Sequence, residues 1–205
     1  LFYSIYSLLD NIDSQINLYV IHKNPKTFSN FHNLLKKEFD NFDLYIYKFE
    51  YSNFYFPEVE NRHVSEATYY RLFIDKIIPK DVDRYIYMDA DIICVNNPEY
   101  YINEIFKDLS DKNQIIGCRT ENNLNSHTDE IFQRLEMKSS RYFNAGVMFV
   151  DHQKWINNNI GELLLKKLEE IQDKIIYWDQ DVLNSFFDGD YIEISQNINY
   201  PVNLR

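Results

Sequence analysis

The 205-residue sequence has a length typical of one domain, and its 32 acidic against 21 basic residues give a net charge of -11. This charge opposes binding to a phosphate backbone, and no basic patch interrupts it, so we expect no nucleic-acid partner. The four glycines cannot form a P-loop or a G-x-G-x-x-G motif, so any bound nucleotide must be held by other means.

The two cysteines and the apolar runs indicate a cytoplasmic protein. Cys94 and Cys118 lack C-x-x-C spacing, and no secretory signal is present, so we expect free thiols that fill the core. No apolar run approaches the roughly 18 residues that a membrane span requires. Peripheral attachment at the inner face of the membrane stays open.

The first half of the chain alternates helical and strand patterns. Apolar residues spaced three and four apart predict helices, and short apolar or alternating runs predict strands. Strands are expected at 16–22, 43–49 and 84–88. Helices are expected at 1–11, 31–39 and 65–77, the last capped by Ser65 and ended by Pro79.

The second half continues the alternation. Strands are expected at 114–118, 146–151 and 191–194, and helices after Pro98, at 152–171 and at 179–187. His152, at the start of the long helix, is expected to face solvent. This order predicts one α/β domain over residues 1–205, with a mixed, mainly parallel sheet flanked by helices.

A pair of carboxylates follows the strand 84–88. Asp89 and Asp91 are two residues apart, and in extended backbone this spacing puts both side chains on one face, where they can share a divalent cation. In open α/β sheets, ligands bind beyond the carboxyl ends of the strands. A solvated acidic loop explains the pair equally well when it is taken alone.

Two further candidates lie just upstream. The Arg71 guanidinium could chelate phosphate or sugar oxygens, although a surface ion pair with Asp75 is the better explanation of Arg71 alone. His63 could donate to a sugar hydroxyl, and the alternative is a solvated loop histidine.

Two polar motifs follow in the second half. Asn144, Ala145 and Gly146 precede a strand, where small residues admit a ligand close to the backbone and an amide can both donate and accept; a plain turn is the alternative. Asp179, Gln180 and Asp181 open the last helix. The helix dipole explains Asp179 but not Gln180, whose carbonyl could stabilise positive charge on a reacting carbon.

Together these segments resemble the family 8 glycosyltransferases, such as glycogenin and bacterial lipopolysaccharide galactosyltransferases. The similarity rests on four motifs in this order: HVSEATYYRL (63–72), YMDAD (87–91), FNAGV (143–147) and DQDVLN (179–184). It implies a GT-A fold and retaining transfer of glucose or galactose from a UDP-sugar to a cell-surface glycan, glycolipid or glycoprotein acceptor.

The resemblance also implies roles for individual residues. The donor site would comprise Arg71, Asp89, Ala90, Asp91, Glu121, Asn144, Ala145 and Gly146. Asp89 and Asp91 would hold Mn²⁺, with Mg²⁺ as the alternative. Asp179, Gln180 and Asp181 would be catalytic, with Gln180 beside the anomeric carbon, and His63 would face the acceptor. Glu121 stands where the family usually carries Asp.

Two parts of the family pattern are absent from the 205 residues. An opening strand with a uridine-binding turn is expected before Leu1, and a third metal ligand, a His in an H-x-x-G-x-x-K-P-W segment, is expected after Arg205. We therefore expect a catalytic domain shortened at both ends.

Two other functions stay open. A phosphatase-like hydrolase also places an Asp-x-Asp pair after an apolar strand, with the first Asp as nucleophile. A non-catalytic sugar-binding relative could keep the same fold.

Overall fold

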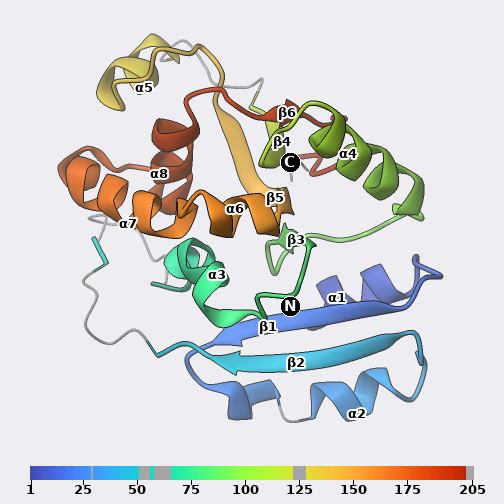
Figure 1. Ribbon diagram of the computed structural model, residues 1–205. Helices are drawn as coiled ribbons and strands as arrows, with labels where there is room; N and C mark the ends of the chain where they lie inside the picture. Colours follow the sequence, from blue (N-terminus) through green and yellow to red (C-terminus); the bar gives the residue numbers. More distant parts are fainter. Residues whose placement is uncertain (29, 51–55, 58–65, 122–127, 202–205) are drawn as a thin grey trace. The chain divides into compact units, whose positions relative to one another are not determined.

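The computed structural model describes residues 1–28, 30–50, 56–57, 66–121 and 128–201. The chain divides into two compact units (Figure 1). The first comprises Leu1–Tyr55 and Asp89–Glu104, and the second comprises Phe56–Met88 and Ile105–Arg205. Each unit is described by itself.

The first unit is a pair of parallel strands with helices packed on one face. Its elements are α1 (Phe2–Leu9), β1 (Ile16–His22), η1 (Pro25–Phe28), α2 (Phe31–Leu35) and β2 (Phe42–Lys48). Alternate strand residues such as Val20 and Phe42 join Ile5, Leu9 and Leu35 of the helices in one buried cluster. The strand predictions for this unit are confirmed within one residue at each end.

The second unit contains a four-stranded sheet of order β3-β5-β4-β6. Its elements are η2 (Glu66–Phe73), α3 (Ile74–Ile77), β3 (Arg84–Met88), β4 (Ile116–Thr120), α5 (Thr128–Arg134), β5 (Phe143–Asp151), α6 (His152–Asn157), α7 (Ile160–Ile171), η3 (Gln172–Lys174), α8 (Trp178–Phe187) and β6 (Ile192–Glu193). Helix α4 (Glu99–Asp111) begins in the first unit and ends in the second.

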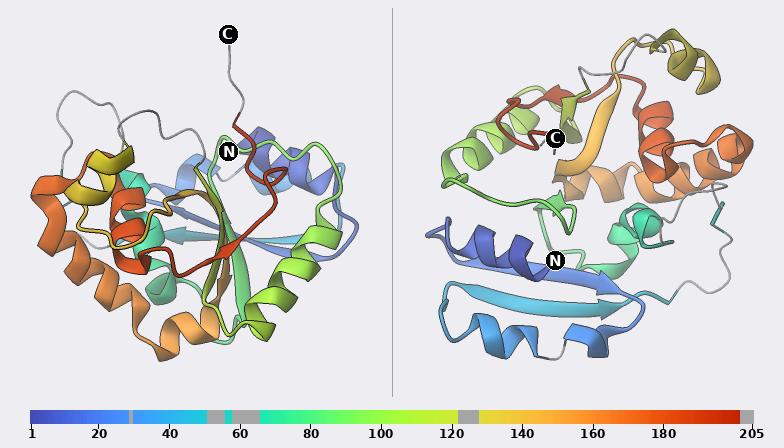
Figure 2. Two further views of the ribbon diagram at one scale, coloured as in Figure 1. Left: turned by 90° about the horizontal axis from the view of Figure 1, so that it is seen from above. Right: turned by 180° about the vertical axis from the view of Figure 1, so that it is seen from behind.

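Helices cover both faces of this sheet (Figure 2). Phe106 of α4 packs on Phe149 of β5 with 5.5 Å between ring centroids. On the other side, α6 and α8 contact β5. Strand β5 is buried over seven of its nine residues because neighbouring strands and both helical layers enclose it. The predicted α/β class is confirmed.

The strand directions agree with the predicted mixed, mainly parallel sheet. Strands β1 and β2 are parallel, as are β4 and β6, but β5 runs antiparallel to both β3 and β4. Strands β3, β4 and β6 therefore run in one direction and β5 alone is reversed, so the sheet is mixed. Apolar periodicity reports which faces of a strand are buried and carries no information on its direction.

Several helix boundaries also differ. The helix expected at 152–171 is broken into α6 and α7 at Asn159, which has a φ of 54° in the left-handed region that Asn tolerates. The helix expected at 65–77 is a 3₁₀ helix (η2) followed by one α-turn (α3). Helix α5 was not predicted, and the proposed cap Ser65 lies outside the described residues.

The expected exposure of His152 is wrong. Its side chain is fully buried, its Nδ1 lies 2.8 Å from the Val82 carbonyl oxygen, and its ring packs edge-on against Tyr85. The residue begins α6 directly after β5, so the helix lays its first turn against the sheet. Both cysteines are free thiols as predicted, and Cys118 is buried.

Candidate functional site

Side chains from two other segments, η2 and α8, hold the start of β5. The β4–β5 pairing shifts register between Cys118, which pairs with Met148, and Arg119, which pairs with Asn144. Backbone groups inside such an irregularity need partners other than the strand ladder. The Ala145 N–H donates to Gln180 Oε1 at 3.0 Å, and the Ala145 carbonyl accepts from Arg71.

Arg71 is buried and links η2 to α8. Its side chain is 6% exposed and its Nε lies 2.6 Å from Asp179 Oδ2. Its guanidinium carbon lies 4.1 Å from the centre of the Tyr87 ring. The surface ion pair with Asp75 is therefore wrong, because the turn of η2 directs Arg71 inward.

Asn144 organises a second set of polar contacts. Its Nδ2 donates to Glu121 Oε1 at 2.5 Å, while its Oδ1 accepts from the Gly146 N–H at 2.8 Å and from Asn199 Nδ2 at 2.6 Å. Glu121 also lies 3.2 Å from Arg119 and is 20% exposed. The pairing of Arg119 with Asn144 across β4 and β5 explains why Glu121 reaches the motif.

Helix α8 is bound to β5 by Asn184, which our site prediction did not single out. Its amide Oδ1 accepts from the Phe143 N–H at 2.7 Å, and its Nδ2 donates to the Phe143 carbonyl at 2.9 Å. Asn184 is fully buried. Its position four residues after Gln180, one helical turn on, is the sequence signal that could have identified it.

Asp181 is fully buried and both of its oxygens are engaged. It contacts Arg134 of α5 at 2.8 Å and accepts from the Tyr142 hydroxyl at 2.7 Å. Burial and the Asp181 carboxylate raise the pKa of Tyr142, so this hydroxyl remains a donor at neutral pH. Arg134 lies in a helix that the sequence did not predict, and nothing in its spacing identified it.

Asp89 and Asp91 lie in a turn that follows β3. The Ile92 N–H donates to the Asp89 carbonyl at 3.2 Å, so the extended backbone assumed for this pair ends at Met88. Ala90 and Asp91 are exposed and Asp89 is half-buried. Within the first unit the chain beyond the turn is tied to α1, because the Cys94 N–H donates to Ser7 Oγ at 3.0 Å.

The described residues contain no group of three or more His, Cys, Asp and Glu side chains that could hold a metal ion. A site at Asp89 and Asp91 would supply two carboxylates, the hard oxygen donors that Mg²⁺ and Mn²⁺ accept, and leave other coordination positions to phosphate and water. The predicted acceptor residue His63 lies outside the described residues.

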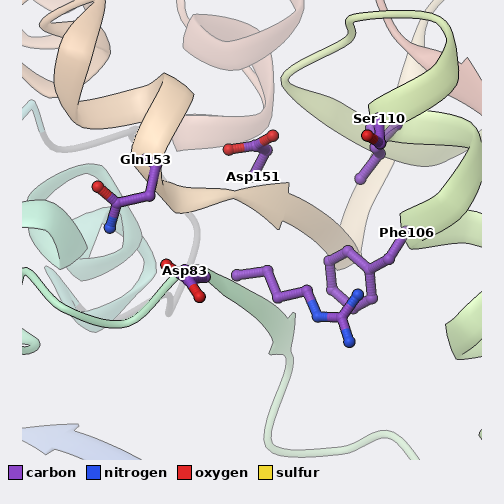
Figure 3. A pocket seen from close by; sticks show the side chains of 7 residues that line it. Asp83, Phe106, Ser110, Asp151 and Gln153 are labelled. Atoms are coloured by element: carbon purple, nitrogen blue, oxygen red, sulfur yellow. The ribbon is translucent and has the colours of Figure 1, made fainter.

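A separate pocket of about 310 Å³ lies at the opposite end of β3, where Asp83 and Arg84 begin the strand. Asp83, Phe106, Asp151 and Gln153 surround it (Figure 3), and the Arg84 guanidinium lies 4.7 Å from the centre of the Phe106 ring. None of the predicted site residues lines this pocket.

The whole chain, residues 1–205, matches the family model described as Glycosyl transferase family 8. The chain therefore belongs to family 8 of the glycosyltransferases, a family that typically uses a divalent metal ion. This membership favours the transferase over the phosphatase-like alternative. In the described part of the chain, no helix is long and apolar enough to cross a membrane.

Relatives in the family include bacterial glycosyltransferases. A putative glycosyltransferase of Haemophilus influenzae is 26% identical over 96% of this chain and 58% of its own length. A lipopolysaccharide 1,3-galactosyltransferase of Salmonella typhimurium is 32% identical over 58% of this chain and 35% of its own length. The chain thus spans about half the length, or less, of these relatives.

Solved structures confirm the fold. The galactosyltransferase LgtC, in complex with donor and acceptor sugar analogues, matches with a TM-score of 0.69 and 20% identity over 88% of this chain and 73% of that chain. An active-site variant of LgtC matches with a TM-score of 0.77 and 21% identity over all of this chain and 74% of that one. The α/β fold is of the GT-A type.

Proposed function

We propose that this chain is the catalytic part of a retaining hexosyltransferase. It would move glucose or galactose from a UDP-sugar to a carbohydrate acceptor on a glycolipid or glycoprotein of the cell surface. One observation carries the proposal: Arg71, Ala145, Asp179 and Gln180 come from three distant segments and meet in one bonded group at the start of β5. Family membership and the named functions of the relatives support it.

The donor sugar would be bordered by the β5 motif. Asn144 and Glu121 present an amide and a carboxylate, which can donate to and accept from sugar hydroxyls, and the Gly146 backbone leaves room for a close approach. Arg71 would face the donor with a charge that Asp179 partly neutralises. Asp179 would accept a hydrogen bond from a donor-sugar hydroxyl.

Gln180 would lie beside the anomeric carbon. One lone pair of its Oε1 accepts the Ala145 N–H, and a carbonyl oxygen has a second one that can face developing positive charge. A solved variant of LgtC carries glutamate in place of an active-site glutamine, which supports a glutamine in the active site of this chain.

Retention requires that the new bond form on the face that the leaving group vacates. The bond between the anomeric carbon and the diphosphate oxygen breaks, the bond to the acceptor oxygen forms on the same face, and the acceptor proton passes to the departing phosphate. Gln180 would stabilise the cationic carbon between these events, since an amide traps it less readily than a carboxylate.

Asp89 and Asp91 would hold Mn²⁺, with Mg²⁺ as the alternative, and Ala90 between them would lie against the ribose through its backbone. When bound, the cation would neutralise the diphosphate and so make it a better leaving group. His63 would face the acceptor. We place the protein in the cytoplasm, with peripheral attachment at the inner face of the membrane where the acceptor is a glycolipid.

The test is a screen of the full-length protein against UDP-sugars for donor hydrolysis and transfer, with calorimetric titration of UDP in Mn²⁺ and in EDTA. Wild-type protein should bind UDP only with the metal. Asp89→Asn and Asp91→Asn should each abolish that binding while the circular dichroism spectrum stays unchanged, because each removes a charged metal ligand.

Asp83→Asn is the matched control, since Asp83 is an exposed carboxylate at the other end of β3. Its binding should equal that of wild type. Undiminished UDP binding by both Asp89→Asn and Asp91→Asn would sink the metal assignment. UDP binding without any turnover would favour the non-catalytic sugar-binding relative, and phosphate release from an aryl phosphate would favour the hydrolase.

A further inference from the structure

The residue before the proposed catalytic pair has a strained backbone. Trp178 has a φ of 47°, in the left-handed region that bulky residues rarely occupy. Such a conformation costs on the order of 1–3 kcal/mol and persists only where the surroundings impose it. Asp179 and Gln180 follow directly, so the direction in which α8 starts depends on what holds Trp178.

The Asp181 carboxylate bridges the strained residue. Its Oδ2 accepts from the Ile176 N–H at 2.7 Å and from the Tyr177 N–H at 2.8 Å, the two residues before Trp178. Asp181 itself lies in the first turn of α8, after Trp178. One side chain therefore joins the chain before the strain to the helix after it.

Arg134 and Tyr142 complete this support. Arg134 Nη1 lies 2.8 Å from Asp181 Oδ2 and its Nη2 lies 3.3 Å from Oδ1, while the Tyr142 hydroxyl donates to Oδ1 at 2.7 Å. Arg134 also donates to the carbonyl of Lys174, in the segment that leads to α8. A fully buried carboxylate needs a paired charge of this kind to be tolerated.

The occupancy of Asp181 bears on its own role. Five hydrogen bonds reach its two oxygens, and its side chain has no exposed surface. With both oxygens occupied by the protein's own donors, Asp181 has no acceptor site left for a sugar hydroxyl. Asp181 therefore differs from Gln180, which is half-buried, although the two are adjacent in the sequence.

We propose that Asp181, Arg134 and Tyr142 are positioning residues, which hold Trp178 in its left-handed conformation and thereby set Asp179 and Gln180 against Arg71 and Ala145. The catalytic part of this inference rests on the proposed function. It removes Asp181 from the group that contacts the sugar and adds Arg134 of α5, which lies 47 positions before Asp181 in the sequence.

The kinetic test is the Arg134→Lys variant of the full-length protein, which keeps the charge and loses the two-pronged contact. We expect kcat per folded molecule to fall by about 10- to 100-fold, because a displacement of the catalytic groups by about 1 Å lowers the rate of the chemical step by up to that factor. The dissociation constant of UDP should stay within about threefold. Unchanged kcat would overturn the proposal, as would a parallel loss of UDP binding.

Tyr142→Phe is the second variant, in case Arg134→Lys does not fold. It keeps the ring and removes one hydrogen bond to Asp181, so a smaller fall in kcat with unchanged UDP binding is expected. Arg84→Lys is the control, because Arg84 lies on Phe106 at the other end of β3. If the control lowers kcat as much as Arg134→Lys does, the effect is not specific to α8 and the proposal fails.

A measurement on Trp178 separates this proposal from the proposed function. Residues 1–205 contain two tryptophans, so Trp178 is the single reporter once Trp155 and any tryptophan outside these residues are replaced by Phe. Adding Arg134→Lys should raise acrylamide quenching of its fluorescence by about twofold, since a released helix start opens locally. Identical quenching with and without Arg134→Lys would show that Arg134 does not help to hold Trp178 in its conformation. Absence of any transferase activity in the wild type would refute only the function.

Discussion

Two groups of buried and half-buried polar side chains in the second unit differ in how many of their polar atoms have a hydrogen-bond partner. In the Asp181 network, formed by Asp181, Arg134 and Tyr142, each side chain contributes to a hydrogen bond or ion pair. In the Asp75 cluster, formed by Asp75, Tyr85 and His152, three buried atoms have no hydrogen-bond partner among the residues that the structure describes: Asp75 Oδ1, Tyr85 Oη and His152 Nε2.

The members of the Asp75 cluster lie close together where α6 begins against β3. The rings of Tyr85 and His152 are 5.3 Å apart, and burial together with the Asp75 carboxylate raises the pKa of Tyr85. The Asp75 carboxylate also lies directly against Gly161, so a Cβ added at Gly161 would overlap the carboxylate. Three elements, α3, β3 and α6, contribute to this cluster, and α7 lies against it through Gly161.

The two groups illustrate two different effects of polar side chains in the interior of a protein. A satisfied network in a low-dielectric interior rigidifies what it joins, and the Asp181 network joins the segments around the proposed catalytic pair. A buried polar atom without a hydrogen-bond partner lowers the free energy of unfolding by about 1–3 kcal/mol, and it does not fix the position of a neighbouring segment. We therefore expect substitutions in the first group to be costly, and those in the second to be mild or stabilising.

The largest effect is expected from Arg134→Met, which leaves the Asp181 carboxylate buried without its charge partner. It should lower the free energy of unfolding by about 3–5 kcal/mol in urea titrations. The double variant Arg134→Met/Asp181→Leu should recover part of this loss, because it removes the uncompensated charge. A double variant less stable than the single one would contradict the charge-pair explanation.

A matched pair of tyrosine substitutions compares the two groups directly. Tyr142→Phe removes a hydrogen bond to a carboxylate and should cost about 1.5–3 kcal/mol. Tyr85→Phe removes a hydroxyl without a partner among the described residues, and should be neutral or stabilise by up to about 1 kcal/mol. Equal costs in thermal and urea unfolding would erase the distinction between the groups.

Gly161→Ala tests the packing of the Asp75 cluster. The new Cβ would overlap the Asp75 carboxylate, and such overpacking costs about 1–3 kcal/mol. In an Asp75→Ala background the same substitution should cost little, because the overlapping oxygens are gone. A cost that is the same in both backgrounds would show that Gly161 is required for a reason other than Asp75.

The smallest effect is a pH dependence from Asp75. Burial raises the pKa of Asp75, opposed by the nearby charge of Lys76 and His152 and reinforced by that of Glu162. A carboxyl group whose pKa is raised in the folded state stabilises the fold at pH values below its pKa in the unfolded state, about 3.9. This contribution is lost as the pH rises through the pKa of the folded state.

Asp75→Asn, which cannot ionise, should therefore gain stability relative to wild type as the pH is raised from about 4 toward 7. Urea unfolding at several pH values measures the difference, with the exposed Asp83→Asn as the control. A difference that does not change with pH, or one that falls, would contradict the raised pKa.

The sequence by itself determined the strands, the α/β class and the four motifs that carry the family resemblance. Short apolar runs and small or polar residues at strand ends are local features, so β1, β2 and β3 were predicted within one residue at each end. The four motifs likewise led to Arg71, Asn144, Asp179 and Gln180. In the second unit Arg71 pairs with Asp179, Gln180 accepts the Ala145 N–H and Asn144 donates to Glu121.

Only the tertiary structure decided which partner each polar group takes. Arg71 pairs with Asp179, 108 positions away, and not with its helical neighbour Asp75. His152 is buried, and Asp181 pairs with Arg134 of α5. The antiparallel direction of β5 was decided in the same way. Burial and ion pairing depend on which distant segments pack together, and local spacing contains no information on that packing.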